Sequence, residues 1–189
     1  MQWLRDGLGI IDSAADVEHL AESVPDSGGV VFVPALTGLG APDWDPYARG
    51  LIIGIGRGTT AGHIARATLE GIAFEVRDVV DLMAEDGAVT LQRLNVDGGA
   101  AANDLLCQTQ ANTLGISVDR PVELQTTGVG AAFLAGLGTG VWSTAEEIAA
   151  CRSLDHSFTP AEDAKLGADL AHRRWREAVS RSRDWAAPN

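Results

Sequence analysis

Short apolar runs that alternate with helical repeats are the feature that most constrains the fold of this chain of 189 residues. The β-branched run within Gly29–Ala35 and the apolar segment Leu51–Ile55 each predict a buried strand. Between them, Thr37–Gly50 is dense in Gly, Pro and Asp and predicts a long loop. Further strands are expected over Leu91–Val96 and Ile116–Pro121. Strands that alternate with helices predict an α/β fold with a mixed sheet and helices packed on it.

The segments between these predicted strands carry the apolar repeats of helices. Between Thr60 and Glu85, apolar residues recur at spacings of three and four, which places them on one face of a helix. These residues are Ala65, Leu69, Ile72, Val76, Val79 and Met83. A second helix is expected from about Ala101 to Leu114, where Gly115 ends it. A third helix, rich in Gly and Ala, is expected over Gly128–Leu137.

Two capping boxes predict the starts of the last two helices. Ser143 followed by Glu146 fits one box, and Thr159 followed by Glu162 fits the other, with Pro160 at the first helical position. The second of these helices is expected to bury one face, made of Ala164, Ala168, Ala171, Trp175, Ala178 and Trp185.

The composition of the chain limits the kinds of partner that it is expected to bind. The net charge of −12 repels nucleic acid and anionic membrane surfaces, so neither is an expected partner. No apolar run reaches about 18 residues, and charges interrupt the first residues, so neither a membrane span nor a signal peptide is predicted. The cysteines and histidines do not have metal-ligand spacing, and no metal site is predicted. We expect a cytoplasmic protein with reduced thiols.

The segment Asp97–Asn103 is the most informative candidate site. A predicted strand ends, Gly98 and Gly99 follow, and a helix begins. Glycines leave no Cβ between the backbone and a ligand, and a helix start presents unpaired N–H groups. A purine or an anionic group can lie against such a turn, and Asn103 adds an amide for an adenine edge or a ribose. The alternative is an ordinary tight turn.

Three other segments carry weaker signals. Gly54–Thr60 fits either a phosphate loop or a flexible turn that caps the next helix. Asp43 and Asp45 fit either a Mg²⁺ or acid–base pair, or aspartates that stabilise their own turn. The small residues of Gly128–Ala132 fit close approach of a helix or a nucleotide, or tight packing alone.

These pieces together resemble the carboxyl half of the FGGY carbohydrate kinases. The segment Gly50–Ile55, seven residues, and then His63–Glu70 fit a signature of that family at every position. Within the family, Phe32–Gly50 is close to the form found in the glycerol kinases. The resemblance extends over essentially the whole chain, from Gln2–Gly7 to Trp185.

The resemblance implies an actin-like ATPase fold, in which two RNase-H-like domains close over ATP and Mg²⁺. The C-terminal domain holds the adenosine and the N-terminal domain holds the polyol, and transfer to glycerol gives glycerol 3-phosphate. By position, Gly99 and Asn103 resemble the adenine-binding pair of the family, and Gln2 resembles a nucleotide-contacting glutamine. The family binds phosphate elsewhere, so the resemblance favours a structural role for Gly54–Thr60.

The chain departs from the family in what it does not contain. The aspartate base in its Asp-Gln-Gln setting and the Asp-x-Gly-Thr-Thr loop do not occur, so no catalytic residue is assigned. Residues 1–189 are expected to be an incomplete C-terminal domain without its first strands and without the N-terminal domain. Negligible kinase activity is expected for the chain alone. The alternatives are a non-catalytic nucleotide-binding module, a kinase for another polyol or sugar, and a structural remnant. Homo-oligomers are possible.

Overall fold

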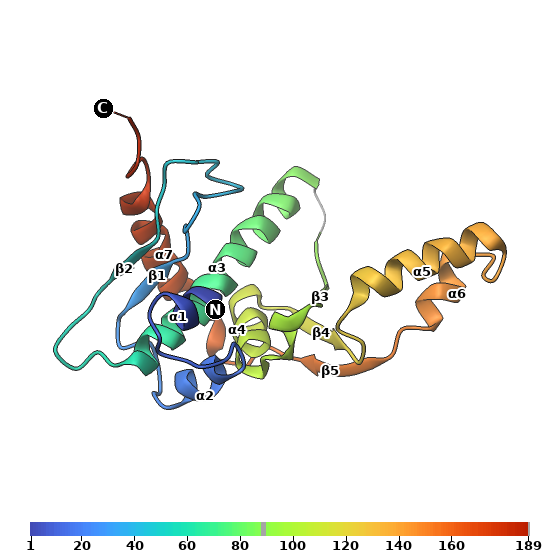
Figure 1. Ribbon diagram of the computed structural model, residues 1–189, viewed down its shortest axis with the longest axis horizontal. Helices are drawn as coiled ribbons and strands as arrows, with labels where there is room; N and C mark the ends of the chain where they lie inside the picture. The colour runs from blue at the N-terminus through green and yellow to red at the C-terminus, as the bar shows by residue number, and fades with distance from the viewer. Residues whose placement is uncertain (88–89, 189) are drawn as a thin grey trace.

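The long helix α3 (Ala61–Gly87) is the element on which the body of the molecule is assembled. The computed structural model describes residues 1–87 and 90–188. Helices α2 (Asp16–Glu22), α4 (Asp104–Leu114) and α7 (Ala164–Ser182) pack against α3, as does the strand β1 (Val31–Val33) (Figure 1). The long helix predicted from the apolar repeat is thereby confirmed.

The strands form two separate sheets. In the first, β1 pairs antiparallel with β2 (Leu51–Ile53), so that Phe32 lies opposite Ile52. In the second, β4 (Ser117–Pro121) pairs parallel with β3 (Arg93–Asn95) and antiparallel with β5 (Leu154–Phe158). The expected mixed sheet is therefore the second one, and β1 and β2 stand apart from it.

Glycines let two neighbours approach the backbone of α3 closely. A Cβ at position 71 would lie 2.5 Å from the carbonyl oxygen of Phe32 in β1. A Cβ at position 62 would lie 2.6 Å from the Ser23 hydroxyl and 3.0 Å from the Leu20 carbonyl oxygen, at the end of α2. The burial of Ala65, Leu69 and their neighbours follows from these approaches, because the apolar face of α3 meets β1 and α2 without a gap.

The C-terminal helix α7 attaches to the same core through one tryptophan. Trp175 is almost fully buried beside Phe74, and its indole N–H donates to the Phe32 carbonyl oxygen at 3.0 Å. Ala178 is buried with it, as the predicted face requires. Trp185 was predicted on this face and the prediction is wrong: it follows the end of α7 and is 77% exposed.

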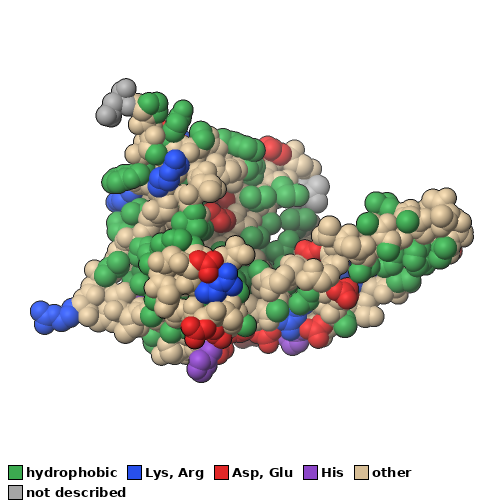
Figure 2. All heavy atoms as spheres, viewed as in Figure 1, with side chains coloured by type: hydrophobic (Ala, Val, Ile, Leu, Met, Phe, Trp, Pro, Cys, Tyr) green, Lys and Arg blue, Asp and Glu red, His purple; other side chains and the backbone are tan. Residues whose placement is uncertain are grey.

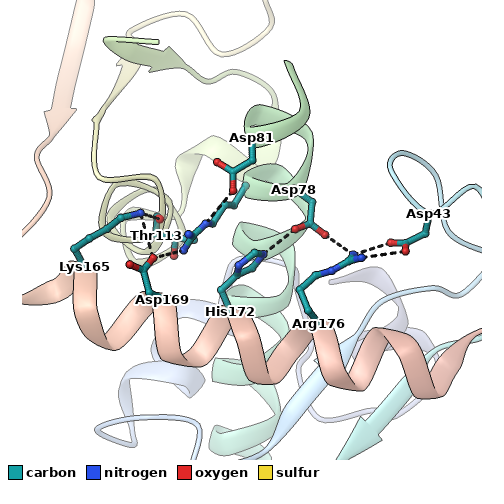
Figure 3. Close-up of polar contacts among 9 residues, drawn as sticks. Asp43, Asp78, Asp81, Thr113, Lys165, Asp169, His172 and Arg176 are labelled. Atoms are coloured by element: carbon teal, nitrogen blue, oxygen red, sulfur yellow. Dashed lines mark hydrogen bonds and ion pairs between the residues drawn. The ribbon is translucent and has the colours of Figure 1, made fainter. Parts of the chain in front are cut away.

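Polar contacts hold α7 along the flank of α3 and against the loop that follows β1 (Figure 3). Asp78 of α3 accepts from Arg176 at 2.7 Å and lies 2.7 Å from the ring nitrogen of His172. Arg176 also makes two bonds to Asp43 in the loop, at 2.7 and 3.1 Å. Because Asp43 and Asp78 are nearly excluded from solvent, these pairs fix α7 and the loop more firmly than surface ion pairs would.

The starts of the last two helices differ from the predicted capping boxes. The first box is shifted by one residue: Thr144 caps α6 (Ala145–Ala150) by accepting from the Glu147 N–H, and the Glu147 carboxylate accepts from the Ser143 N–H. Threonine serves as the cap as well as serine does, so sequence spacing alone did not fix the register.

The second predicted box does not form. Helix α7 begins only at Ala164, and no side chain caps it. The segment before α7 is instead held by α4: Asn112 accepts from the Ala161 N–H at 3.0 Å, and Gln108 donates to the Thr159 carbonyl oxygen at 2.8 Å. These contacts between segments far apart in the sequence fix the backbone where the local box was predicted.

The strand β5 and the helix α2 were not predicted from the sequence. Four of the five residues in β5 are exposed, so no alternation of apolar and polar side chains marks it as a strand. Helix α2 has only seven residues, which is too short for a clear helical repeat. Among the helices of residues 1–87 and 90–188, none has both the length and the apolar character needed to cross a membrane.

We expect Gly71→Ala and Gly167→Ala to change stability in opposite directions. The added Cβ at position 71 meets the Phe32 carbonyl oxygen, and such overpacking costs about 1–3 kcal/mol. Position 167 on α7 is exposed, with nothing within 4 Å of the new Cβ, so helix propensity should raise the free energy of unfolding by about 1 kcal/mol. Urea denaturation followed by circular dichroism measures both. Equal effects of the two substitutions would contradict the close approach of β1 to α3.

Candidate functional site

The bend that follows β3 is fixed by hydrogen bonds from both sides. The Val96 N–H donates to the Asp119 carbonyl oxygen of β4 at 3.1 Å, and the Gly98 N–H donates to the Leu124 carbonyl oxygen at 2.8 Å. The Thr126 hydroxyl, at the start of helix α5 (Thr126–Thr139), donates to the Asp97 carboxylate. The bend is thus tied to β4 and to α5 and is a rigid feature of the surface.

The two glycines of the bend face open space. Gly98 has φ +77° and ψ 174°, a conformation that is essentially restricted to glycine. A Cβ at Gly98 or at Gly99 would meet no atom within 4 Å. Within the described residues, the N–H groups of Gly99 and Ala100 donate to no acceptor in the chain. The bend therefore offers two free amide donors that no side chain covers.

Asn103 lies at the far end of the bend and caps α4. Its side-chain oxygen accepts from the Leu106 N–H at 2.6 Å, and the residue is only 7% exposed. The carboxamide nitrogen makes no hydrogen bond within the described part of the chain. The cap fixes the orientation of this amide, which leaves one donor group for a ligand.

The start of α4 differs from the sequence-based interpretation, in which its N–H groups were free. The Glu18 carboxylate accepts from the Leu105 N–H at 2.7 Å, and the side-chain oxygen of Asn103 accepts from the Leu106 N–H. Asp104 adds a second carboxylate, which pairs with Arg120 at 2.5 Å. An anion at this helix start would meet occupied donors and negative charge, so the site suits a neutral ring better than a phosphate.

Gln2 lies on an element next to this corner. It is the first residue of α1 (Gln2–Asp6) and is exposed. Met1 and Leu4 belong to the same apolar cluster as Leu106 of α4, together with residues of α2 and α3. The fold thus joins α1, which carries Gln2, to the core on which α4 also packs, and it places Gly99 and Asn103 in one bend.

A cavity of about 580 Å³ lies on the other side of the bend. It is bounded by the ends of β3 and β4 and by the face of α5 that carries Val129 and Phe133. Asp97 lines it, but Gly99, Asn103 and Gln2 do not. Sequence reasoning did not find this cavity, because its walls come from segments that are far apart in the chain.

The weaker candidate segments have structural contacts in the described residues. The Thr59 hydroxyl accepts from the Gly56 N–H at 2.9 Å, and the Thr60 N–H donates to the His63 ring at 3.1 Å at the start of α3. These contacts agree with the capping alternative for Gly54–Thr60.

The two aspartates of the loop are likewise engaged. Asp43 binds Arg176, as described above. The Asp45 carboxylate accepts from the N–H groups of Asp184, Tyr47 and Ala48, and these bonds hold its pKa below the usual range. Both therefore stabilise the loop. Within residues 1–87 and 90–188, no three His, Cys, Asp or Glu side chains are grouped so as to hold a metal ion.

The small residues of Gly128–Ala132 have no close neighbour. A Cβ at Gly128 or Gly130 would meet nothing within 4 Å. Among the described residues, these two glycines are therefore not held by tight packing against another element.

Comparison with known proteins identifies the class. The C-terminal domain of the FGGY family of carbohydrate kinases matches residues 1–139. The chain therefore belongs to this family, and its fold is that of the C-terminal domain of such kinases.

Among the relatives, the similarity is to glycerol kinases. The chain is 59% identical to the glycerol kinase of Aromatoleum aromaticum and 56% identical to glycerol kinase 2 of Thermotoga maritima, over 99% and 98% of its length. These alignments span only 38% and 37% of the two relatives. The crystal structure of Plasmodium falciparum glycerol kinase with ADP superimposes with a TM-score of 0.84 at 32% identity, over 96% of this chain and 36% of that one.

We expect Gly98→Ala to destabilise the fold and Gly99→Ala to leave it nearly unchanged. Alanine at position 98 must adopt φ near +77°, which costs about 1–3 kcal/mol. Gly99 has no positive φ and no neighbour within 4 Å, so the change there should stay within about 0.5 kcal/mol. Thermal denaturation compares the two variants with the parent chain. A loss of stability in Gly99→Ala as large as in Gly98→Ala would show that the bend is not open as described.

Proposed function

We propose that this chain supplies the adenosine-binding part of an ATP-dependent glycerol kinase, which converts glycerol to glycerol 3-phosphate. The observation that carries the proposal is the open bend from Asp97 to Asn103, with two free amide donors and an oriented carboxamide. The similarity to a glycerol kinase whose structure holds ADP supports it.

In this proposal Gly99 and Asn103 bind the adenine. The absence of a side chain at Gly99 lets the flat ring approach the backbone, and the amide of Asn103 donates to an acceptor on its edge. Gln2 contacts the nucleotide from the neighbouring helix α1. The carboxylates of Glu18 and Asp104 keep the phosphates away from the start of α4, so the phosphates point toward the part of the kinase that carries the polyol.

Phosphoryl transfer also needs a base for the glycerol hydroxyl and Mg²⁺ at the phosphates. We assign neither to this chain. The carboxylates that resembled a magnesium pair, Asp43 and Asp45, are engaged by Arg176 and by backbone N–H groups, so they do not fit a Mg²⁺ site. In this proposal residues 1–189 form the C-terminal nucleotide-binding domain without its first strands, and the base lies in polypeptide equivalent to the other three fifths of the relatives. The proposed compartment is the cytoplasm.

Glycerol is favoured over other polyols by the identity values. The bacterial relatives named glycerol kinase are 54–59% identical to this chain. Among the solved structures, the Plasmodium falciparum glycerol kinase is 32% identical and the xylulose kinase of Lactobacillus acidophilus is 25% identical, with TM-scores of 0.84 and 0.82. The fold is common to both activities, and the greater sequence similarity supports glycerol.

Isothermal titration calorimetry with ADP tests the adenosine site. We expect Gly99→Val to weaken binding at least tenfold, because the new side chain fills the space in front of the free amides. Asn103→Asp keeps the oxygen that caps Leu106 but removes the amide donor, so it should also weaken binding while leaving the melting temperature nearly unchanged. Gly167→Ala, in the first turn of α7 and with nothing within 4 Å of the new Cβ, is the control. Unchanged affinity in both site variants would refute the site.

A coupled assay for glycerol 3-phosphate tests whether this chain alone can catalyse phosphoryl transfer. The purified chain alone should give no turnover above background with ATP, Mg²⁺ and glycerol, because positioning and the base are the main catalytic contributions and the base lies elsewhere. Normal turnover by the chain alone would overturn the assignment.

A further inference from the structure

Arg120 is hydrogen-bonded to the chain on both sides of Asn103. It belongs to β4, and only 13% of its side chain is exposed. One terminal nitrogen of its guanidinium group donates to the Ala101 carbonyl oxygen at 3.1 Å and to the Asp104 carboxylate at 2.5 Å. A single group therefore holds the backbone before Asn103 and the side chain that follows it.

The guanidinium group of Arg120 is itself held in place by β5. Its Nε donates to the Asp155 carboxylate at 2.8 Å, and its central carbon lies 5.2 Å from the centre of the Phe158 ring. The register of β4 and β5 shifts after Arg120 and leaves Asp155 between two paired residues, and such a bulge re-aims a side chain. Because contacts on several sides fix this planar group, the sheet determines the position of Arg120.

The bend lies between the body and a projecting arm. Helices α5 and α6 extend from the body as this arm (Figure 1), and Thr126, at the start of α5, donates to Asp97 in the bend. On the side of the body, the Val96 N–H reaches β4 at the start of the bend, and Arg120 holds the end of the bend. The orientation of Asn103 relative to the sheet depends on the second of these attachments.

Arg120 also brings a positive charge to an acidic part of the surface. Asp104 and Asp155 both pair with it, and the Glu18 carboxylate lies at the start of the same helix α4. Figure 2 shows acidic side chains along the lower edge of the molecule, with a few basic ones among them. Loss of Arg120 would therefore act on ADP in two ways, through the position of Asn103 and through repulsion of the phosphates. Adenosine, which carries no phosphate, separates the two.

We propose that Arg120 is the positioning residue of the adenosine site. It fixes the last turn of the bend and the start of α4, so that the carboxamide of Asn103 keeps the orientation in which it donates to the base. Binding groups must stay within about 0.5 Å of the productive geometry, which requires that neighbouring groups lock them. The bond from Leu106 orients this carboxamide relative to α4, whereas Arg120 orients it relative to the bend that carries Gly99. The inference rests on the proposed function.

Calorimetry with ADP and with adenosine compares Arg120→Met with Arg77→Met. Arg77 on α3 is a matched control, because its side chain is 14% exposed and it also pairs with two carboxylates, those of Asp81 and Asp169. The two substitutions should lower the melting temperature by similar amounts. Arg120→Met should weaken adenosine about tenfold, the loss expected when one hydrogen bond to the base is misplaced, and ADP at least as much. Arg77→Met should keep the affinities of the parent chain.

Equal losses of affinity in the two variants would mean that Arg120 only stabilises the fold, and a loss limited to ADP would mean that it acts by charge alone. Either result would overturn the inference. Arg120→Lys serves if Arg120→Met does not fold. Its ammonium keeps the charge but is a compact group that cannot reproduce the forked contacts to Ala101, Asp104 and Asp155, so adenosine should bind about threefold more weakly. Parent affinity for adenosine in Arg120→Lys would contradict the inference.

Amide hydrogen exchange at Leu106 separates the inference from the proposed function, because it needs no nucleotide. This N–H donates to the side-chain oxygen of Asn103 at 2.6 Å, so its exchange reports how firmly the carboxamide is held. Exchange should be about tenfold faster in Arg120→Met than in Arg77→Met. Equal exchange in the two variants would overturn the inference. Faster exchange in Arg120→Met, with no binding of ADP or adenosine by the parent chain, would refute the adenosine site and leave the positioning of Asn103 by Arg120 standing.

Discussion

The close contact between the backbone of α3 and its neighbours is the constraint on which the body depends. Glycine at positions 62 and 71 lets α2 and β1 lie directly on the helix, and Trp175 then fastens α7 to the same strand through the Phe32 carbonyl oxygen. Side-chain packing could tolerate volume-conserving replacements, but a backbone approach of this kind accepts no additional atom. The positions of α4 and the bend follow from it, because α4 also packs on α3.

In the candidate site, groups that make structural contacts also carry the proposed binding roles. Asn103 orients its amide by capping α4, and Glu18 satisfies the next N–H while adding negative charge. The result is a corner where a neutral ring is preferred to a phosphate. The bend provides free amides because its glycines turn the chain away from the sheet while Leu124 and Thr126 hold its other groups.

The parts of the fold and of the candidate site that depend on a local sequence pattern could be predicted from the sequence. The apolar repeat predicted α3, and the strand–glycine–helix order predicted the bend, with Gly115 ending α4 in a left-handed conformation. The errors arose where distant segments compete. Side chains of α4 bind the backbone at Thr159 and Ala161, where a local box was predicted, and β5 is held by pairing with β4 and not by an apolar pattern. The binding roles of Gly99, Asn103 and Gln2 came from family resemblance, and they remain predictions.

The arm formed by α5 and α6 has a consequence for the lifetime of the folded chain. Within the arm, Trp142 packs against Phe133 and Gly136, and the body holds the arm through the bend and the end of β4. Local opening there requires less free energy than global unfolding. A protease acting on the native protein would therefore cut first near Gly138–Gly140, where α5 ends, and the rate of clearance in a cell would depend on how long this segment stays uncovered.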